Sequence, residues 1–219
     1  MSQELQQKIV VAGRVRNLEE CLAKLESYPR KTPGAFDYPG SGDLGKLTEE
    51  EVVRTRKLSS RISNKEVAFF VEASATAPWI SALADLADAD PEGELFADMT
   101  DLYWHFAENA PKGVSIAKIS KVLHLKQPKL FPILDSRLAR SYAPQTKSLR
   151  MQYPQLGKRR RIWLAIRNDL LAARDSGALD ELRQRLSAFE SDEINEKTQD
   201  EIRCLAGLTD LRLLDMLVW

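Results

Sequence analysis

The sequence predicts an all-α protein, and three observations support this class. Apolar residues recur at helical spacing along almost the whole 219-residue chain. No stretch alternates apolar and polar residues in the way that a half-buried strand does. Two capping patterns, each a Ser or Thr followed three residues later by Glu, mark helix starts. We therefore expect a compact bundle of about nine or ten helices in two packed subdomains.

The first helix is expected over 4–27, where an apolar stripe runs from Ile9 to Leu25. It ends before YPRKTPGAFDYPGSGDLGK, the longest stretch rich in Pro and Gly and the expected joint between the subdomains. Thr48 with Glu51 and Ser63 with Glu66 then open the next two helices. The later helices are expected at 49–62, 64–74, 78–88, 92–108, 115–125, 136–143, 158–175, 178–190 and 196–218, the last broken near Gly207.

These elements are read as one domain over 1–219. Its parts are an N-terminal helix and loop at 1–47, a helical core at 48–145 and C-terminal helices at 146–219. A chain of this length is long enough to bury a substantial core.

Charge is distributed unevenly along this chain of zero formal net charge. Residues 112–161 contain thirteen of the 32 Lys and Arg residues but only one of the 32 acids, Asp135. A cationic segment in a neutral chain indicates a polyanion or an anionic surface as the partner. We interpret it as a nucleic-acid contact, although charged runs are usually solvated faces.

Other features argue against a metal site and a membrane span. Cys21 and Cys204 lie far apart without metal-type spacing, and His105 and His124 are the only histidines, so we expect no metal and no cofactor. Both cysteines are expected to be reduced, half-buried packing residues. No apolar run approaches the ~18 residues of a membrane span, so we expect a cytoplasmic protein that makes no membrane contact. We also expect it to be a monomer.

Residues 111–135, PKGVSIAKISKVLHLKQPKLFPILD, have a layout suited to phosphate binding. A helix ending near Asn109 is expected to turn at Gly113 and to lead into a second helix within two or three residues. The backbone N–H groups of such a turn and the N-terminus of the second helix suit a phosphate, which Lys121 would reinforce. The expected contacts are Lys112, Gly113, Val114, Ser115 and Lys118.

A second set of expected contacts opens the helix at 158–175. Lys158, Arg159 and Arg160 stand at its N-terminus, where positive charge opposes the helix dipole. An external anion such as a phosphate is therefore the expected compensating partner.

A short loop closed by Pro128 and Pro132 leads to Asp135, which precedes the expected helix SRLARSY. An aspartate at this position favours an N-cap. The residues alone leave two interpretations open: an ordinary helix cap, and a functional carboxylate set apart in a cationic segment.

The arrangement resembles the helix-hairpin-helix DNA glycosylase superfamily. That pattern is a Leu-Pro-Gly-Val-Gly hairpin followed by a Val-Asp-Thr-His-Val-like segment, and the counterparts here read GVSIAKISKVL and FPILDSRL. SKVLHLKQPKLFPILDSRL, TRKLSSRIS and LRLLDMLVW are similar to a bacterial branch of the superfamily that is known mainly as a domain of unknown function.

The resemblance implies an enzyme that flips a modified or damaged base out of duplex DNA and cleaves its N-glycosidic bond. Asp135 is then the catalytic aspartate, which stabilises an oxocarbenium-like sugar and can orient water. Ala117 stands where bifunctional members carry a Schiff-base lysine, which implies a monofunctional enzyme that leaves an abasic site. Lys121, one turn further on, is either a displaced amine nucleophile or a phosphate or pocket contact. Ser115 replaces the second hairpin glycine and restricts the turn.

A flipped base is held by stacking and by hydrogen bonds to its edge. The candidate pocket residues are Phe36, Tyr38, Arg54, Arg61, Trp79 and His124. Arg54 and Arg61 are expected on one helical face, where salt bridges are an equal alternative. For Trp79 and His124 the alternative is core packing.

The sequence leaves the substrate and the class of function open. The base is either damaged or hypermodified, as in phage genomes, which would make the protein a bacterial repair or anti-phage defence enzyme that works on the nucleoid. One rival is a non-catalytic helix-hairpin-helix DNA-binding protein. Another is an all-α interaction or regulatory protein with an acidic protein partner.

Overall fold

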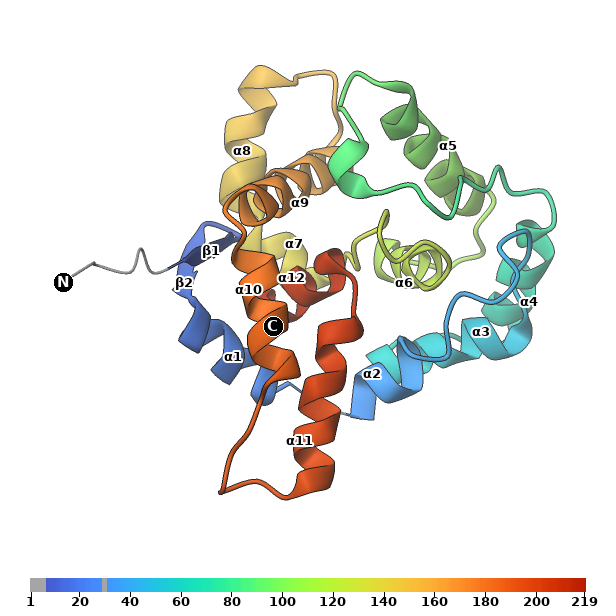
Figure 1. Ribbon diagram of the computed structural model, residues 1–219. Coiled ribbons are helices and arrows are strands. Elements are labelled where there is room, and N and C mark those ends of the chain that lie inside the picture. The colour runs from blue at the N-terminus through green and yellow to red at the C-terminus, as the bar shows by residue number, and fades with distance from the viewer. Residues whose placement is uncertain (1–6, 29–30) are drawn as a thin grey trace. The chain divides into compact units, whose positions relative to one another are not determined.

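The structure is a computed structural model that describes residues 7–28 and 31–219. In this part of the chain there are twelve α-helices, three short 3-10 helices and one two-stranded sheet (Figure 1). The all-α class is therefore confirmed, with more helices than expected. The α-helices are α1 (Leu18–Glu26), α2 (Lys31–Phe36), α3 (Glu49–Arg54), α4 (Asn64–Ser74), α5 (Glu94–Glu108), α6 (Ile116–Lys126), α7 (Ser136–Ser141), α8 (Ala143–Gln152), α9 (Lys158–Asp175), α10 (Ala178–Ser187), α11 (Glu196–Arg203) and α12 (Asp210–Val218). The remaining elements are β1 (Lys8–Val11), β2 (Arg14–Asn17), η1 (Thr55–Leu58), η2 (Leu86–Asp88) and η3 (Cys204–Gly207).

The chain divides into two compact units. Among the described residues, unit 1 joins 7–28 to Arg140–Trp219, and unit 2 is Lys31–Ala139. The stretch rich in Pro and Gly begins near the first boundary, and the second boundary lies within α7. The expected divisions at 47 and 145 fall inside units 2 and 1 respectively.

The N-terminal segment of unit 1 differs from the single helix expected over 4–27. Residues 4–6 lie outside the described part, and Lys8–Val11 pairs with Arg14–Asn17 in an antiparallel hairpin. Its turn uses Ala12 and Gly13, both with positive φ, as the two-residue hairpin turn requires. Helix α1 begins only after the hairpin, with a capping box from Asn17.

The core of unit 1 is built around α12, which packs against α1, α9 and β1 (Figure 1). Every residue from Leu211 to Val218 is buried, including a charged pair. Arg212 donates to Asp215 and to the Tyr28 hydroxyl at 3.2 Å, so its buried charge is paired with a carboxylate inside the core. The expected break near Gly207 is confirmed, because η3 separates α11 from α12.

Two further expectations in unit 1 were incomplete. Helix α8 was not predicted, because APQTKSLRMQ carries few apolar residues to mark a helical stripe. Cys21 is buried and burial raises its pKa to about 11, whereas Cys204 is exposed, so Cys204 is not the packing residue that was expected.

Unit 2 confirms both predicted capping boxes. Thr48 and Glu51 cap α3, and Ser63 and Glu66 cap α4. The helix expected over 49–62 is interrupted, however. It ends at Arg54 and continues as η1, after which Ser59 adopts a left-handed conformation with φ 57°.

The helix expected over 78–88 is wrong. Only the single turn of η2 forms there. Backbone carbonyls before η2 accept hydrogen bonds from a residue outside the segment. The Gln127 amide donates to Ile80 O at 2.7 Å and to Ser81 O at 3.4 Å, and Leu86 N donates to Lys129 O at 3.0 Å. These tertiary bonds replace the ones that a helix would make.

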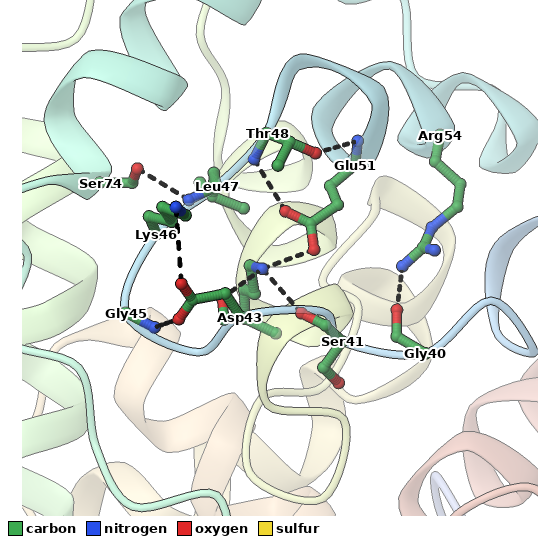
Figure 2. Close-up of polar contacts among 11 residues, drawn as sticks. Gly40, Ser41, Asp43, Gly45, Lys46, Leu47, Thr48, Glu51, Arg54 and Ser74 are labelled. Carbon is green, nitrogen blue, oxygen red and sulfur yellow. Dashed lines mark hydrogen bonds and ion pairs between the residues drawn. The ribbon is translucent and has the colours of Figure 1, made fainter.

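The loop between α2 and α3 is held by Lys126, at the end of α6. The Lys126 side chain has no exposed area, and its ammonium group donates to Glu51 Oε1 at 2.6 Å, Ser41 O at 2.7 Å and Asp43 O at 2.8 Å. Three donors therefore meet three acceptors, as a buried ammonium group requires. Figure 2 shows the backbone of this loop curving around the Glu51 carboxylate.

Glycine is required at one point of this clamp. Gly42 has φ 59°, and a Cβ at this position would clash with Glu51 Oε1. The loop then enters α3 through Leu47 and Thr48, and the Leu47 N–H donates to Ser74 Oγ at 2.9 Å (Figure 2). The stretch expected as a joint is thus fastened to α3, α4 and α6.

Replacing Lys126 with methionine keeps most of the side-chain volume but removes the ammonium group. The Glu51 carboxylate then stays buried without its partner, and breaking a buried pair in this way costs about 3–5 kcal/mol. We expect the free energy of unfolding in urea to fall by this amount.

Lys46→Met is the matched control for this clamp. It changes the same residue type in the same loop, but its ion pair with Asp43 is exposed, so a much smaller change is expected. Equal urea midpoints for Lys126→Met and wild type would rule the clamp out.

Candidate functional site

Asp135 lies at the N-terminus of α7 and is partly exposed. Its Oδ1 accepts hydrogen bonds from the backbone N–H groups of Arg137 and Leu138, both at 2.9 Å, which confirms the predicted N-cap. Oδ2 accepts no hydrogen bond from the described residues. One carboxylate oxygen is therefore fixed and the other stays available.

The segment leading to Asp135 is rigidly held. Phe131, Ile133 and Leu134 are buried, and Leu134 N donates to Ser120 Oγ on α6 at 2.9 Å. The position of the carboxylate is thus set by packing against the helix that follows the turn at Gly113.

The turn between α5 and α6 has the sharp geometry that the sequence predicted. Gly113 has φ 108°, and Val114 N donates to Pro111 O at 3.1 Å. Ser115 is the N-cap of α6 and accepts from Lys118 N at 3.4 Å, with φ −101°. This φ suits any residue, so the serine replaces a glycine here without backbone strain.

Two lysines expected beside a phosphate are used inside unit 2. Lys118 Nζ pairs with Glu66 Oε1 at 2.6 Å, and Lys121 Nζ donates to Leu58 O at 2.6 Å. Lys121 is 7% exposed, so the amine is held in the interior rather than presented to a sugar. Lys112, in contrast, is exposed and has no partner among the described residues.

Glu66 joins α4 to the turn at Gly113. Its carboxylate accepts from Ser63 N at 2.7 Å, Ser63 Oγ at 3.0 Å and Lys118 Nζ at 2.6 Å. Its Oε1 lies 3.0 Å from where a Cβ on Gly113 would stand. Burial raises the pKa of Glu66, but the hydrogen bonds from Lys118 and Ser63 outweigh burial and lower it.

Two expected pocket residues belong to the core of unit 2. Phe36 and His124 stack with ring centroids 6.1 Å apart, and each is 1% exposed. His124 Nδ1 lies 2.7 Å from Phe131 O, and a carbonyl can only accept, so Nδ1 carries the proton. Because both rings are buried, neither presents a face on which a flipped base could stack.

The remaining pocket candidates are dispersed within unit 2. Arg54 donates to Gly40 O. Burial lowers the pKa of Arg54, and this outweighs the carboxylates of Glu51 and Asp37, which raise it. Arg61 is exposed and does not share a helical face with Arg54, because α3 ends between them.

The two aromatic candidates differ in exposure. The indole N–H of Trp79 donates to Ser74 O at 3.1 Å, and its ring packs 5.7 Å from that of Phe106. Tyr38 is 45% exposed and therefore can contact a ligand.

Sequence reasoning missed an exposed leucine near the segment that leads to Asp135. Leu83 is 85% exposed in the loop that Gln127 fastens to the end of α6. Lys129, two residues after Gln127, is exposed and has no side-chain partner among the described residues. The local sequence gives little signal for this loop, because proline is tolerated at the first position of a helix, where Pro78 stands, and residues 79–90 contain no Gly or Pro.

The cations at the start of α9 belong to unit 1. Lys158 is exposed, and Arg160 donates to Gln155 O at 3.1 Å. Arg159 lies over the Trp163 ring, 5.3 Å from its centroid. The three residues are thus at the surface or partly exposed, as phosphate contacts require.

A hollow of about 410 Å³ in unit 1 contains none of the expected pocket residues. It is lined by Ala23, Glu26, Ser27, Glu193, Ile194, Asn195 and Thr198. Over the described residues, no group of three or more His, Cys, Asp and Glu is arranged to hold a metal ion. No helix in that part of the chain is both long and apolar enough to cross a bilayer.

Comparison with known proteins places the chain in a family but gives no activity. The family model described as "Family of unknown function (DUF6308)" matches residues 23–219. Neither the curated proteins nor the solved structures contain a match.

Asp135→Ala removes the cap of α7 and should cost about 1 kcal/mol of stability, the usual value for an N-cap. Asp135→Asn should keep most of it, because an amide oxygen accepts the same two N–H bonds. Urea unfolding of both variants tests this, and equal losses for Ala and Asn would contradict the cap.

The lowered pKa of Glu66 predicts a pH-dependent contribution to stability. Its carboxylate stabilises the fold fully above the unfolded-state pKa of about 4.3, and this is lost as the pH falls through the lower folded-state pKa. Glu66→Gln should therefore be less stable than wild type at pH 7, with the difference vanishing in acid. Glu72→Gln, an exposed site on the same helix, is the control and should show no such convergence.

Proposed function

The chain belongs to the DUF6308 family, whose function is unknown, and we propose that it is a DNA glycosylase that releases a modified or damaged base and leaves an abasic site. The observation that carries this proposal is the Asp135 carboxylate. One of its oxygens is fixed by two backbone N–H groups, and the other is available at a partly exposed helix start.

A fixed carboxylate suits the proposed reaction. When the bond between the sugar C1′ and the base nitrogen breaks, its electron pair leaves with the base and positive charge develops on the sugar. A negative group held in place before the reaction stabilises that charge at no reorganisation cost. Water then adds its oxygen to C1′, and its proton ends on the base nitrogen, so one water molecule is consumed.

The resemblance to the helix-hairpin-helix superfamily supports the same role for Asp135. A turn at Gly113 is followed by a helix and then by a proline-containing segment that ends in the aspartate. We propose the monofunctional, water-using reaction because Ala117 stands at the Schiff-base position and the Lys121 amine is engaged with Leu58 O.

Unit 2 also offers groups that can hold DNA and extrude a base. Lys112 and Lys129 are exposed cations without partners among the described residues, which suits phosphate contacts. Leu83 stands exposed on a loop that is fastened at both ends, and an apolar side chain of this kind can wedge between base steps. Tyr38 is the exposed aromatic candidate for stacking. Phe36 and His124 are buried, so the proposed pocket does not include them.

The substrate is proposed as a class. A damaged base implies repair, and a hypermodified base of the kind found in phage DNA implies defence. Either role places the protein in the bacterial cytoplasm on double-stranded DNA. We propose that it acts there as a monomer.

One observation favours a second candidate function. The N-cap alone accounts for an aspartate at position 135, which fits a DNA-binding protein that uses the same turn without catalysis. In that case removal of the negative charge strengthens DNA binding and affects nothing else.

Asp135→Asn separates these functions, since it keeps the cap but removes the charge. The purified chain is incubated with several genomic DNAs, including heavily modified phage DNA, and free bases are measured by mass spectrometry and abasic sites by alkali cleavage. We expect wild type to release a base and Asp135→Asn to release about 100-fold less, the usual scale for losing one preorganised charge-stabilising group, while its DNA affinity is retained.

Asp90→Asn is the matched control, because Asp90 also accepts a backbone hydrogen bond, from Glu92 N at 2.9 Å, elsewhere in unit 2. It should release base at the wild-type rate. Equal release by Asp135→Asn and wild type refutes the catalytic role, and strand cleavage without alkali refutes the monofunctional reaction. Duplex binding with no base release from any DNA supports the non-catalytic candidate. Absence of salt-dependent DNA affinity supports an acidic protein partner.

A further inference from the structure

Unit 1 contains a long span without acidic residues. Between Asp135 and Asp169 the sequence has nine Lys and Arg residues and no Asp or Glu. Eight of the nine, from Arg140 to Arg167, belong to unit 1, where they lie on or between α7, α8 and α9.

Three of these cations are exposed and unneutralised. Lys147 and Arg150 project from α8, and Lys158 is the first residue of α9, against which α8 packs. Within the described residues, none of the three side chains makes an ion pair, hydrogen bond or ring contact. We call Lys147, Arg150 and Lys158 the α8 surface.

The arginines beside the α8 surface are oriented by uncharged groups. Arg160 donates to Gln155 O at 3.1 Å, and Arg161 donates to Leu156 O. A carbonyl oxygen fixes a guanidinium but does not cancel its charge. The first acid after the span, Asp169, accepts from Ala12 N at 2.8 Å and from the Tyr142 hydroxyl, so it is committed elsewhere.

Arginines later in unit 1 are treated differently. Each of the following makes an ion pair with at least one carboxylate: Arg174 and Arg183 with Asp210, Arg185 with Glu19 and Glu181, Arg203 with Glu196 and Asp200, and Arg212 with Asp215. The same unit therefore pairs its later arginines with carboxylates but leaves Lys147, Arg150 and Lys158 without such partners among the described residues.

The chemistry of the α8 surface fits a nucleic-acid backbone better than a protein. A protein interface normally has an apolar or aromatic centre. Helix α8 exposes one large apolar side chain, Met151, which is 88% exposed. Duplex DNA carries one negative charge per about 1.7 Å of its axis and so meets several separated cations at once.

We infer that the α8 surface binds the phosphate backbone of duplex DNA without regard to sequence. This rests on the proposed function only for the choice of DNA as the polyanion. It assigns unit 1 a set of phosphate contacts in addition to those of Lys112 and Lys129 in unit 2, and it extends the expected contacts at 158–160 to Lys147 and Arg150.

The test is the salt dependence of binding to an unmodified duplex, measured with the full chain by fluorescence anisotropy. Each phosphate contact contributes about 0.9 to the slope of log K against log salt. Lys147→Gln combined with Arg150→Gln should reduce that slope by about 1.8. Lys197→Glu removes the same two units of charge from α11, where Lys197 is exposed, and should leave the slope unchanged.

Each outcome is decisive for the α8 surface. A wild-type slope in the double variant overturns it, and so does an equal reduction in Lys197→Glu, because net charge would then explain the effect. Salt-independent or absent DNA binding by wild type also overturns it. Circular dichroism establishes that each variant is folded.

Base release from susceptible DNA, measured on the same variants at saturating DNA, separates this inference from the glycosylase proposal. Lys197→Glu, which lies outside both proposed sets of phosphate contacts, should release base at the wild-type rate. A reduced slope together with no base release by wild type keeps the α8 surface and refutes the glycosylase. Base release with an unchanged slope does the reverse.

Discussion

The buried ammonium group of Lys126 organises unit 2. A charge in the protein interior is strongly unfavourable unless every donor is satisfied, and this lysine is satisfied by Glu51 and two loop carbonyls. The ion pair therefore fixes α3, the preceding loop and the end of α6 relative to one another. Gln127 follows immediately and fastens the loop that carries Leu83, so the same anchor supports the segment that leads to Asp135.

The cationic run of the sequence contains two physically different groups of residues. Lys118, Lys121 and Lys126 all lie on α6, and each is turned towards a carboxylate or a carbonyl of unit 2. They stabilise the fold and are not available to a polyanion. The exposed cations of α8 and the start of α9 are held on a separate unit, where they keep their charge. Counting charges along the sequence does not separate the two groups. Whether a lysine is paired inside the unit or exposed depends on which face of its helix is packed.

Local interactions were predictable from the sequence, and distant ones were not. The capping boxes at Thr48 and Ser63 and the cap by Asp135 depend on residues two or three positions apart, so the letters specify them. The β1–β2 hairpin was missed because its few apolar residues fit a helical stripe as well as a strand. Loss of the helix at 78–88 depends on Gln127, which lies more than forty residues away.

The candidate site shows the same division. The N-cap at Asp135 and the turn at Gly113 were predictable, since both depend on local sequence. The burial of Phe36 against His124 was not, because these residues meet only through folding. The separation of Arg54 from Arg61 was not predictable either, because the expected helix stops at Arg54. Burial of a side chain is a property of the whole unit, and periodicity alone does not reveal it.

The division of the chain into units also constrains the order of folding during synthesis. Unit 2 is continuous, so every residue it needs has been made once Ala139 leaves the ribosome. Unit 1 is discontinuous, and β1 and α1 must wait for α12, the helix that fills their core. Ile9 and Val11, which are buried in the folded unit, therefore stay exposed on the nascent hairpin until α12 has been made.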